Sequence, residues 1–387
     1  MKRILSLVIA FSMAVSLLPC GIGFAAAEES ENLIIAKDET PLRLIYDEQA
    51  PFGNEDVSKD PNKYPMHSAD DGWERWSLPL GNGYFGINVF GRTETERVQI
   101  TEKTLANPYY KKIGNESPSL GGLNNFSETY LDFGHTNENV TNYSRDLDLR
   151  TAVSHVKYDY DGTTYTREYF VSYPDKTVVI KLDASQAGKI DFTLRPTIPY
   201  IQEYAAVPGD GASKEGTVVA SDDGSILLSG HMGYFNIDFE GQYKVIPTGG
   251  SLSASNSVNE NGETDGGAIT VNGADSCYIV ITLGTNYELS SNIFLESDPK
   301  KKLSHASETA HEKVSREMQN ALSYDYETLK ARHIEDYSNI FGRVSLNLGI
   351  DKNDLNKTTD ELLNEYKQGT YSSYLETLYF QYGRYLL

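Results

Sequence analysis

The sequence predicts a mainly β fold, an antiparallel β-sandwich followed by helices, and three observations support this class. Short apolar runs recur from about Pro41 to Leu295, and the clearest are residues 156–160, 177–183 and 277–283. Turn-forming pairs such as Asp161-Gly162 stand between such runs. Tyrosine, which favours strands, is frequent, with 27 residues in 387. Because no helical pattern separates the runs, we expect antiparallel sheets packed face to face.

Residues 248–267 interrupt this pattern, because they are rich in Gly, Ser and Asn. Such a composition is typical of connections between elements rather than of strands. We therefore expect a long exposed loop here. Cys277 follows in a strand-like apolar run, which predicts a buried and unreactive thiol.

The pattern becomes helical near residue 300. Residues 300–341 have helical spacing, and Asp325 is placed to cap a second helix within them. Residues 344–349 alternate like a single strand. Thr358 and Glu361 have the spacing of a capping box, which predicts a helix that ends at Gly369.

A last helix is predicted from about Ser372 to the end of the chain. Its apolar side chains recur at helical intervals, and they are Leu375, Leu378, Tyr379, Tyr382 and Leu386. We expect this face to lack partner helices within the chain, as if the sequence stopped inside the first helix of a larger helical domain. The tail from about Thr358 is then expected to fray.

The N-terminus has the pattern of a secretory signal. Lys2 and Arg3 precede an apolar run, and the small residues 25–27 precede two glutamates. We expect cleavage near Ala27 and a secreted protein that keeps no membrane segment afterwards. Lipidation at Cys20 is the less favoured alternative, because Pro19 occupies a position where a small residue is expected.

Charge and motif content exclude several classes of function. The net charge of −21 makes nucleic acid and anionic membranes improbable partners. No His or Cys spacing fits a metal site, and no phosphate loop or dinucleotide fingerprint is present, so no metal and no cofactor are expected. The acidic pairs Asp70-Asp71 and Asp146–Asp148 are interpreted as solvent-facing side chains.

Several segments resemble glycoside hydrolase family 95, the α-L-fucosidases and α-L-galactosidases. The strongest is Trp73–Gly91, which contains Leu-Pro-Leu-Gly-Asn-Gly after a tryptophan. Further similar segments follow in order, and they are Glu96–Leu105, Tyr143–Ala152, Tyr165–Phe170, His333–Tyr337 and Tyr379–Leu387. The resemblance runs from about residue 42 to the end. Ala106-Asn107-Pro108 and Tyr84 depart from the family pattern, which leaves fucoside against galactoside specificity open.

The resemblance implies a β-sandwich, a helical linker and an (α/α)6 barrel that holds the catalytic groups. On this plan we expect a signal peptide at 1–27, a flexible leader at 28–40, the sandwich at 41–300, the linker at 301–342 and the start of the barrel at 343–387. Family members invert configuration by means of barrel residues, and none of those motifs is matched here. We therefore assign no catalytic residue and expect the chain alone to be inactive.

Trp76 and Asn82 are the candidate substrate-binding residues. A tryptophan face stacks on the C–H surface of a sugar, and an asparagine amide both donates to and accepts from hydroxyls. The alternative is structural, with Trp76 in the sandwich core and Asn82 in a turn. The expected partners are fucosylated glycans and the remaining barrel of the same polypeptide. Two other functions stay open, a carbohydrate-binding or scaffold module without chemistry and a relative of the disaccharide phosphorylases.

Overall fold

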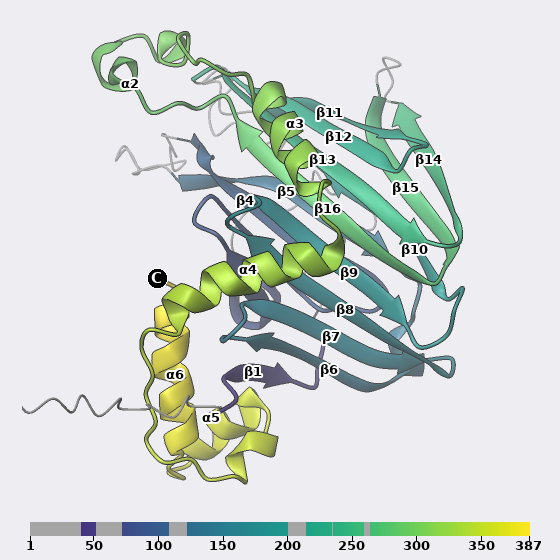
Figure 1. Ribbon diagram of the computed structural model, residues 1–387, viewed down its shortest axis with the longest axis vertical. Coiled ribbons are helices and arrows are strands. Elements are labelled where there is room, and N and C mark those ends of the chain that lie inside the picture. The colour runs from purple at the N-terminus through teal and green to yellow at the C-terminus, as the bar shows by residue number, and fades with distance from the viewer. Residues whose placement is uncertain (1–39, 52–71, 108–121, 200–213, 234, 259–263) are drawn as a thin grey trace, which may run out of the picture. The chain divides into compact units, whose positions relative to one another are not determined.

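Two antiparallel sheets form the body of the molecule. The computed structural model describes residues 40–51, 72–107, 122–199, 214–233, 235–258 and 264–387 (Figure 1). One sheet has nine strands in the order β1-β6-β7-β8-β9-β16-β13-β12-β11, and the other has seven in the order β14-β15-β10-β5-β4-β3-β2. The predicted fold class, a β-sandwich followed by helices, is confirmed.

The elements of the nine-stranded sheet are β1 (Arg43–Tyr46), β6 (Val140–Asp148), β7 (Val153–Tyr160), β8 (Thr163–Ser172), β9 (Thr177–Ala184), β11 (Lys214–Ser221), β12 (Ser225–Met232), β13 (Ile237–Thr248) and β16 (Ser276–Thr285). Those of the seven-stranded sheet are β2 (Leu78–Gly81), β3 (Phe85–Val89), β4 (Thr95–Asn107), β5 (Gly122–Asp132), β10 (Ile190–Thr197), β14 (Ser251–Val258) and β15 (Thr264–Ala274). The helices are α2 (Ser291–Leu295), α3 (Ala310–Ala321), α4 (Tyr326–Phe341), α5 (Thr359–Lys367) and α6 (Ser373–Tyr385).

Strands β9 and β16 lie in the middle of the nine-stranded sheet and are buried on both faces. Ile180 and Ile279 point into the core between the sheets, whereas Val179 and Val280 pack against the helices outside. This double burial explains why the predicted strands 177–183 and 277–283 read as continuous apolar runs rather than as alternating ones. Cys277 is buried as predicted, and desolvation raises the pKa of its thiol to about 12, which keeps it protonated.

Helices α3 and α4 cover the outer face of the nine-stranded sheet (Figure 1). Met318, Ala321 and Leu329 supply the apolar contact. Lys330 on α4 forms an ion pair with Glu168 on β8, with 2.6 Å between Nζ and Oε2. The caps predicted at Asp325 and at Thr358 are present, since each side chain accepts a hydrogen bond from the backbone N–H of the third residue of its helix.

The expectation of a long loop at 248–267 is wrong. Strands β14 and β15 occupy most of this segment and form the edge of the seven-stranded sheet. Gly249 and Gly250, with φ of 71° and 67°, turn the chain from β13 in one sheet to β14 in the other. A Cβ on Gly250 would lie 2.5 Å from the carbonyl oxygen of Asn272. The small residues therefore form a tight turn and an edge strand with small side chains here, not a flexible connection.

Two expectations for the helical region also need correction. Residues 344–349 form no strand, because their side chains are mostly exposed and no strand edge pairs with them. The first long helix, α3, begins only at Ala310, where Thr309 and Glu312 form a capping box. Residues 302–309, which lie within the range 300–341 of predicted helical spacing, precede this helix.

The last helix finds more contacts than expected. Leu375 and Leu378 on α6 are buried, with 7% and 1% exposure, in the same cluster as Leu362 on α5. The Oη atom of Tyr385 donates a hydrogen bond to the carbonyl of Pro79 on β2 at 2.7 Å. The expectation of an unpartnered apolar face is therefore wrong for these side chains. Tyr379 and Leu386, at 79% and 56% exposure, do lie open to solvent.

The predicted signal peptide, its cleavage site and Cys20 lie outside the described residues, as does nearly all of the predicted leader. The pair Asp70-Asp71 also lies outside them. Within the part of the chain that the structure describes, no helix combines the length and the apolar content needed to cross a membrane. The boundaries proposed for sandwich, linker and barrel stay predictions.

Candidate functional site

Trp76 lies at the end of a π-helical turn, Gly72–Trp76, that leads into β2. The side chain is half-buried, and the position of its backbone is fixed from inside the sandwich, since Nη1 of the buried Arg145 donates to the Trp76 carbonyl at 2.5 Å. Trp73, one turn earlier, is 45% exposed and so offers more ring surface to solvent. Trp73 and Trp76 belong to the same Trp-x-x-Trp segment of the sequence, and only the structure shows that Trp73 is the more exposed of the two.

Asn82 forms the turn between β2 and β3. Its Oδ1 accepts hydrogen bonds from the N–H groups of Tyr84 and Phe85 at 2.9 and 3.0 Å. Its Nδ2 donates to the carbonyl of Ser172 at 2.9 Å and thereby joins the two sheets. The amide keeps one N–H group for another acceptor.

Trp76 and Asn82 do not share one loop. The strand β2 lies between them, and at about 3.3 Å per residue it separates the two positions by roughly 15–20 Å. One monosaccharide is too small to contact both side chains. The hydrogen bond from Tyr385 on α6 reaches Pro79 between them, so the C-terminal helix runs beside this strand. Substrate binding by either residue stays a prediction.

The turn of Asn82 also positions a pair of stacked tyrosines. The ring of Tyr84 stacks on that of Tyr173, with 5.8 Å between centroids and 25° between planes. Tyr173 lies in the turn between β8 and β9 and is 51% exposed. Lys103 and Lys176 place their Nζ atoms 3.9 and 5.7 Å from the Tyr84 centroid. Sequence reasoning missed this group because its members come from three separate segments.

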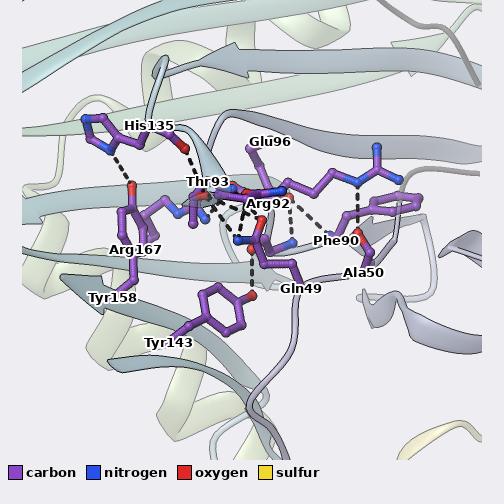
Figure 2. A network of polar contacts seen from close by, with 12 residues as sticks. Gln49, Ala50, Phe90, Arg92, Thr93, Glu96, His135, Tyr143, Tyr158 and Arg167 are labelled. Atoms are coloured by element: carbon purple, nitrogen blue, oxygen red, sulfur yellow. Dashed lines mark hydrogen bonds and ion pairs between the residues drawn. The ribbon is translucent and has the colours of Figure 1, made fainter. Parts of the chain in front are cut away.

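A network of buried polar groups lies between the sheets (Figure 2). Glu96 on β4 is fully buried and accepts hydrogen bonds from the N–H groups of Phe90 and Gly91. Arg167 on β8 forms an ion pair with Glu96, with 3.1 Å between Nη1 and Oε2, and donates to the Arg92 carbonyl at 2.8 Å. The pair therefore ties one sheet to the other through the core.

The same network fixes the chain around Gly91. Arg92 donates to the carbonyls of Ala50 and Pro51, and the Oη atom of Tyr143 donates to the carbonyl of Gly91 at 2.6 Å. A Cβ at Gly91, where φ is 76°, would lie 2.6 Å from that hydroxyl. Burial raises the pKa of Tyr143 above its ordinary value, which keeps the hydroxyl a donor. This network is structural, because its acids are enclosed and matched by arginines.

The acids at Asp146 and Asp148 are bound to neighbouring groups of the protein. Asp146, interpreted from the sequence as solvent-facing, is instead buried and paired with Arg43 and His155. Asp148 accepts a hydrogen bond from the N–H of Arg150. Among the described residues, no group of three or more His, Cys, Asp and Glu side chains is arranged to hold a metal ion.

Two family models match different parts of the chain. The N-terminal domain of glycosyl hydrolase family 65 matches residues 109–290. The catalytic domain of glycosyl hydrolase family 95 matches residues 325–387. Alpha-L-fucosidase 2 of Arabidopsis thaliana is 26% identical over 360 residues, which cover 80% of this chain and 40% of the relative. The probable alpha-fucosidase A of Aspergillus niger is 25% identical, with the same coverage.

The chain is therefore similar to glycoside hydrolases of families 65 and 95. It spans about 40% of the length of the curated relatives it matches. A solved structure described as a kojibiose phosphorylase from the human microbiome is 14% identical, with a TM-score of 0.46 over 81% of this chain and 41% of that one. Helix α6 lies within the residues that match the family 95 catalytic model.

Proposed function

We propose that the chain is the N-terminal part of a secreted glycoside hydrolase that cleaves α-L-fucosidic or α-L-galactosidic bonds of glycans with inversion. The observation that carries this proposal is the similarity to two α-fucosidases over 80% of the chain, which continues into the family 95 catalytic model. The signal-like N-terminus supports secretion. The exposed Tyr379 and Leu386 on α6 support packing against further barrel helices.

The 387-residue chain alone is expected not to hydrolyse fucosides. Inverting hydrolysis needs an acid and a base on opposite sides of the bond, with about 6.5–9.5 Å between the carboxyl groups for a water to enter. Glu96 and Glu128, two carboxylates in the sandwich interior, are each matched by an arginine and closed off from substrate. The measurement is release of 4-nitrophenol from 4-nitrophenyl α-L-fucoside, compared with a mock preparation. Release by the purified chain would place the active site within these residues.

The same assay tests the proposed function when it is applied to a longer polypeptide, obtained by extending the reading frame past Leu387. Hydrolysis of the fucoside or of the matching α-L-galactoside by the longer polypeptide supports the proposal and decides the specificity. Anomeric analysis of the first product tests inversion. A stop codon at that position, with glycan binding but no turnover, would instead favour a carbohydrate-binding or scaffold module. Phosphate-dependent cleavage would favour a relative of the disaccharide phosphorylases.

We further propose that Trp76 contacts the substrate and that Asn82 mainly positions the turn beside it. In an active family 95 enzyme that carries these residues, Trp76→Ala should raise KM by about 3- to 10-fold, the factor that ~0.5–1.5 kcal/mol of ring stacking gives. Asn82→Ala should lower the free energy of unfolding by about 1–2 kcal/mol, because two N–H groups and a carbonyl lose their partner.

Kinetics per folded molecule and urea denaturation separate the two roles. Asn82→Asp is the matched control, since it keeps both acceptor contacts and loses only the donation to Ser172. A Trp76→Ala enzyme that loses stability at unchanged KM would show that the ring serves the sandwich core instead.

A further inference from the structure

The stacked tyrosines and their lysines form an exposed surface, the tyrosine–lysine platform, made of Tyr84, Lys103, Tyr173 and Lys176. The Nζ atom of Lys103 lies over the ring of Tyr84, and the ring of Tyr173 stacks on the same ring. The remaining ring surface is that of Tyr173, which is 51% exposed. Lys103 and Tyr84 belong to the seven-stranded sheet side and the other two residues to the β8–β9 turn, so the platform bridges the two sheets.

Hydrogen bonds fix the turn that carries Tyr173, and stacking on Tyr84 orients its ring. The carbonyl of Ser172, directly before it, accepts from Asn82. The hydroxyl of Ser172 donates to Asp175 at 2.8 Å, and Asp175 accepts from Nε of Arg332 on α4 at 2.9 Å. The β8–β9 turn is thus held by hydrogen bonds from the β2–β3 turn and from α4. An aromatic ring that is both exposed and immobilised loses little entropy when a ligand stacks on it.

The platform is a local site of positive charge on an acidic chain. The formal net charge is −21, yet two ammonium groups lie beside one ring. Lys176 has an ion pair with Glu317 at 3.4 Å, whereas Lys103 has no ion pair with any described residue. Lys176 also has φ of 50°, a conformation that Gly and Asn adopt at lower cost. A lysine therefore occupies a position where its backbone conformation is unfavourable.

We propose that the tyrosine–lysine platform binds an anionic sugar unit of a glycan, outside the bond that is cleaved. The ring of Tyr173 stacks on the C–H face of the sugar. The ammonium group of Lys103, helped by Lys176, pairs with a carboxylate or sulfate substituent on that sugar. This inference rests on the proposed function only in taking a carbohydrate as the ligand class, and it adds the charge of the glycan and the residues that recognise it.

Binding of polysaccharides to the full chain tests the platform without any turnover. The probes are a sulfated galactan, its desulfated form and polygalacturonate, measured by isothermal titration at low salt and at 0.5 M salt. We expect binding to at least one of the two anionic polymers, the sulfated galactan or polygalacturonate. The desulfated galactan should bind at least tenfold more weakly than that polymer. High salt should weaken the binding, because it screens an exposed ion pair.

Tyr173→Ala and Lys103→Gln should each weaken binding of the anionic polymer by about 3- to 10-fold at unchanged Tm. Tyr371→Ala and Lys352→Gln are the matched controls, since both side chains are exposed and lie outside the platform. Equal affinity for anionic and neutral galactan, or equal affinity in Tyr173→Ala and the unaltered chain, overturns the inference. So does loss of binding in the control variants, which would indicate nonspecific attraction.

The outcome is separable from that of the proposed function. Hydrolysis of 4-nitrophenyl α-L-fucoside involves no anionic unit, so Tyr173→Ala should leave it unchanged in an active longer polypeptide. Loss of that hydrolysis in Tyr173→Ala would show that the platform instead contacts the catalytic part of the protein, and would overturn the inference. Failure of all fucoside hydrolysis would refute the proposed function and leave the binding result standing.

Discussion

Replacing Arg167 with Met is expected to lower the free energy of unfolding by about 3–5 kcal/mol. Arg167 and Glu96 are 2% and 0% exposed, and their ion pair crosses from β8 in one sheet to β4 in the other. Removing the guanidinium leaves a carboxylate in the core, held only by two backbone N–H groups and by more distant charges. It also leaves the Arg92 carbonyl without this donor.

A surface pair in the same fold provides the control. Arg195 and Asp132 join β10 to β5 in the seven-stranded sheet, but they are 28% and 33% exposed. Arg195→Met should therefore cost only about 0–1 kcal/mol. The double variant Arg167→Met with Glu96→Gln should regain part of the loss, because it no longer buries a charge. The measurement is guanidinium or urea denaturation, with ΔG compared at equal slope. A loss below 1 kcal/mol in Arg167→Met would show that water or Arg92 already compensates Glu96.

This pair also shows how far the sequence could predict the interior. The alternation of Tyr165, Arg167 and Tyr169 along β8 puts their side chains on one face of the strand. This alternation does not predict that the face with Arg167 points into the core, because arginine is mostly a surface residue. Its partner Glu96 lies 71 positions earlier on the other sheet, and no local pattern joins the two.

The candidate site divides in the same way. The family resemblance directed attention to Trp76 and Asn82, and the turn chemistry of Asn82 was readable as one structural alternative. The sequence pattern did not predict that a strand, β2, separates the two residues. It also did not predict that Tyr84 stacks on Tyr173 across the two sheets. Composition failed for β14, where a segment rich in Ser forms the edge strand of the seven-stranded sheet. Local signals with a fixed spacing, such as the caps at Asp325 and Thr358, succeeded.

Acid is expected to destabilise the protein through His135, by about 2 kcal/mol between pH 7 and pH 5. His135 is 8% exposed, its ring stacks on Tyr160 at 4.3 Å, and Nδ1 is 2.9 Å from the hydroxyl of Tyr158. Burial, followed by the positive charge of Arg167, lowers its pKa to about 4. In the unfolded chain the pKa is about 6.5. Between these values the unfolded chain binds a proton that the folded chain does not, so stability falls as the pH falls through 6.5.

His135→Phe should remove this part of the pH dependence, because Phe preserves an aromatic ring in the stack and does not titrate. The decisive quantity is the difference in unfolding free energy between pH 7 and pH 5, obtained by urea denaturation at both values. It should shrink by about 2 kcal/mol relative to the unaltered chain. His305→Phe, a change at an exposed histidine, is the matched control and should leave the difference intact. Part of the acid sensitivity should survive in His135→Phe, since burial also lowers the pKa of His333 on the buried side of α4. An unchanged difference in His135→Phe would mean that the imidazole is protonated in the folded protein, with Asp191 as the nearby negative charge that stabilises it.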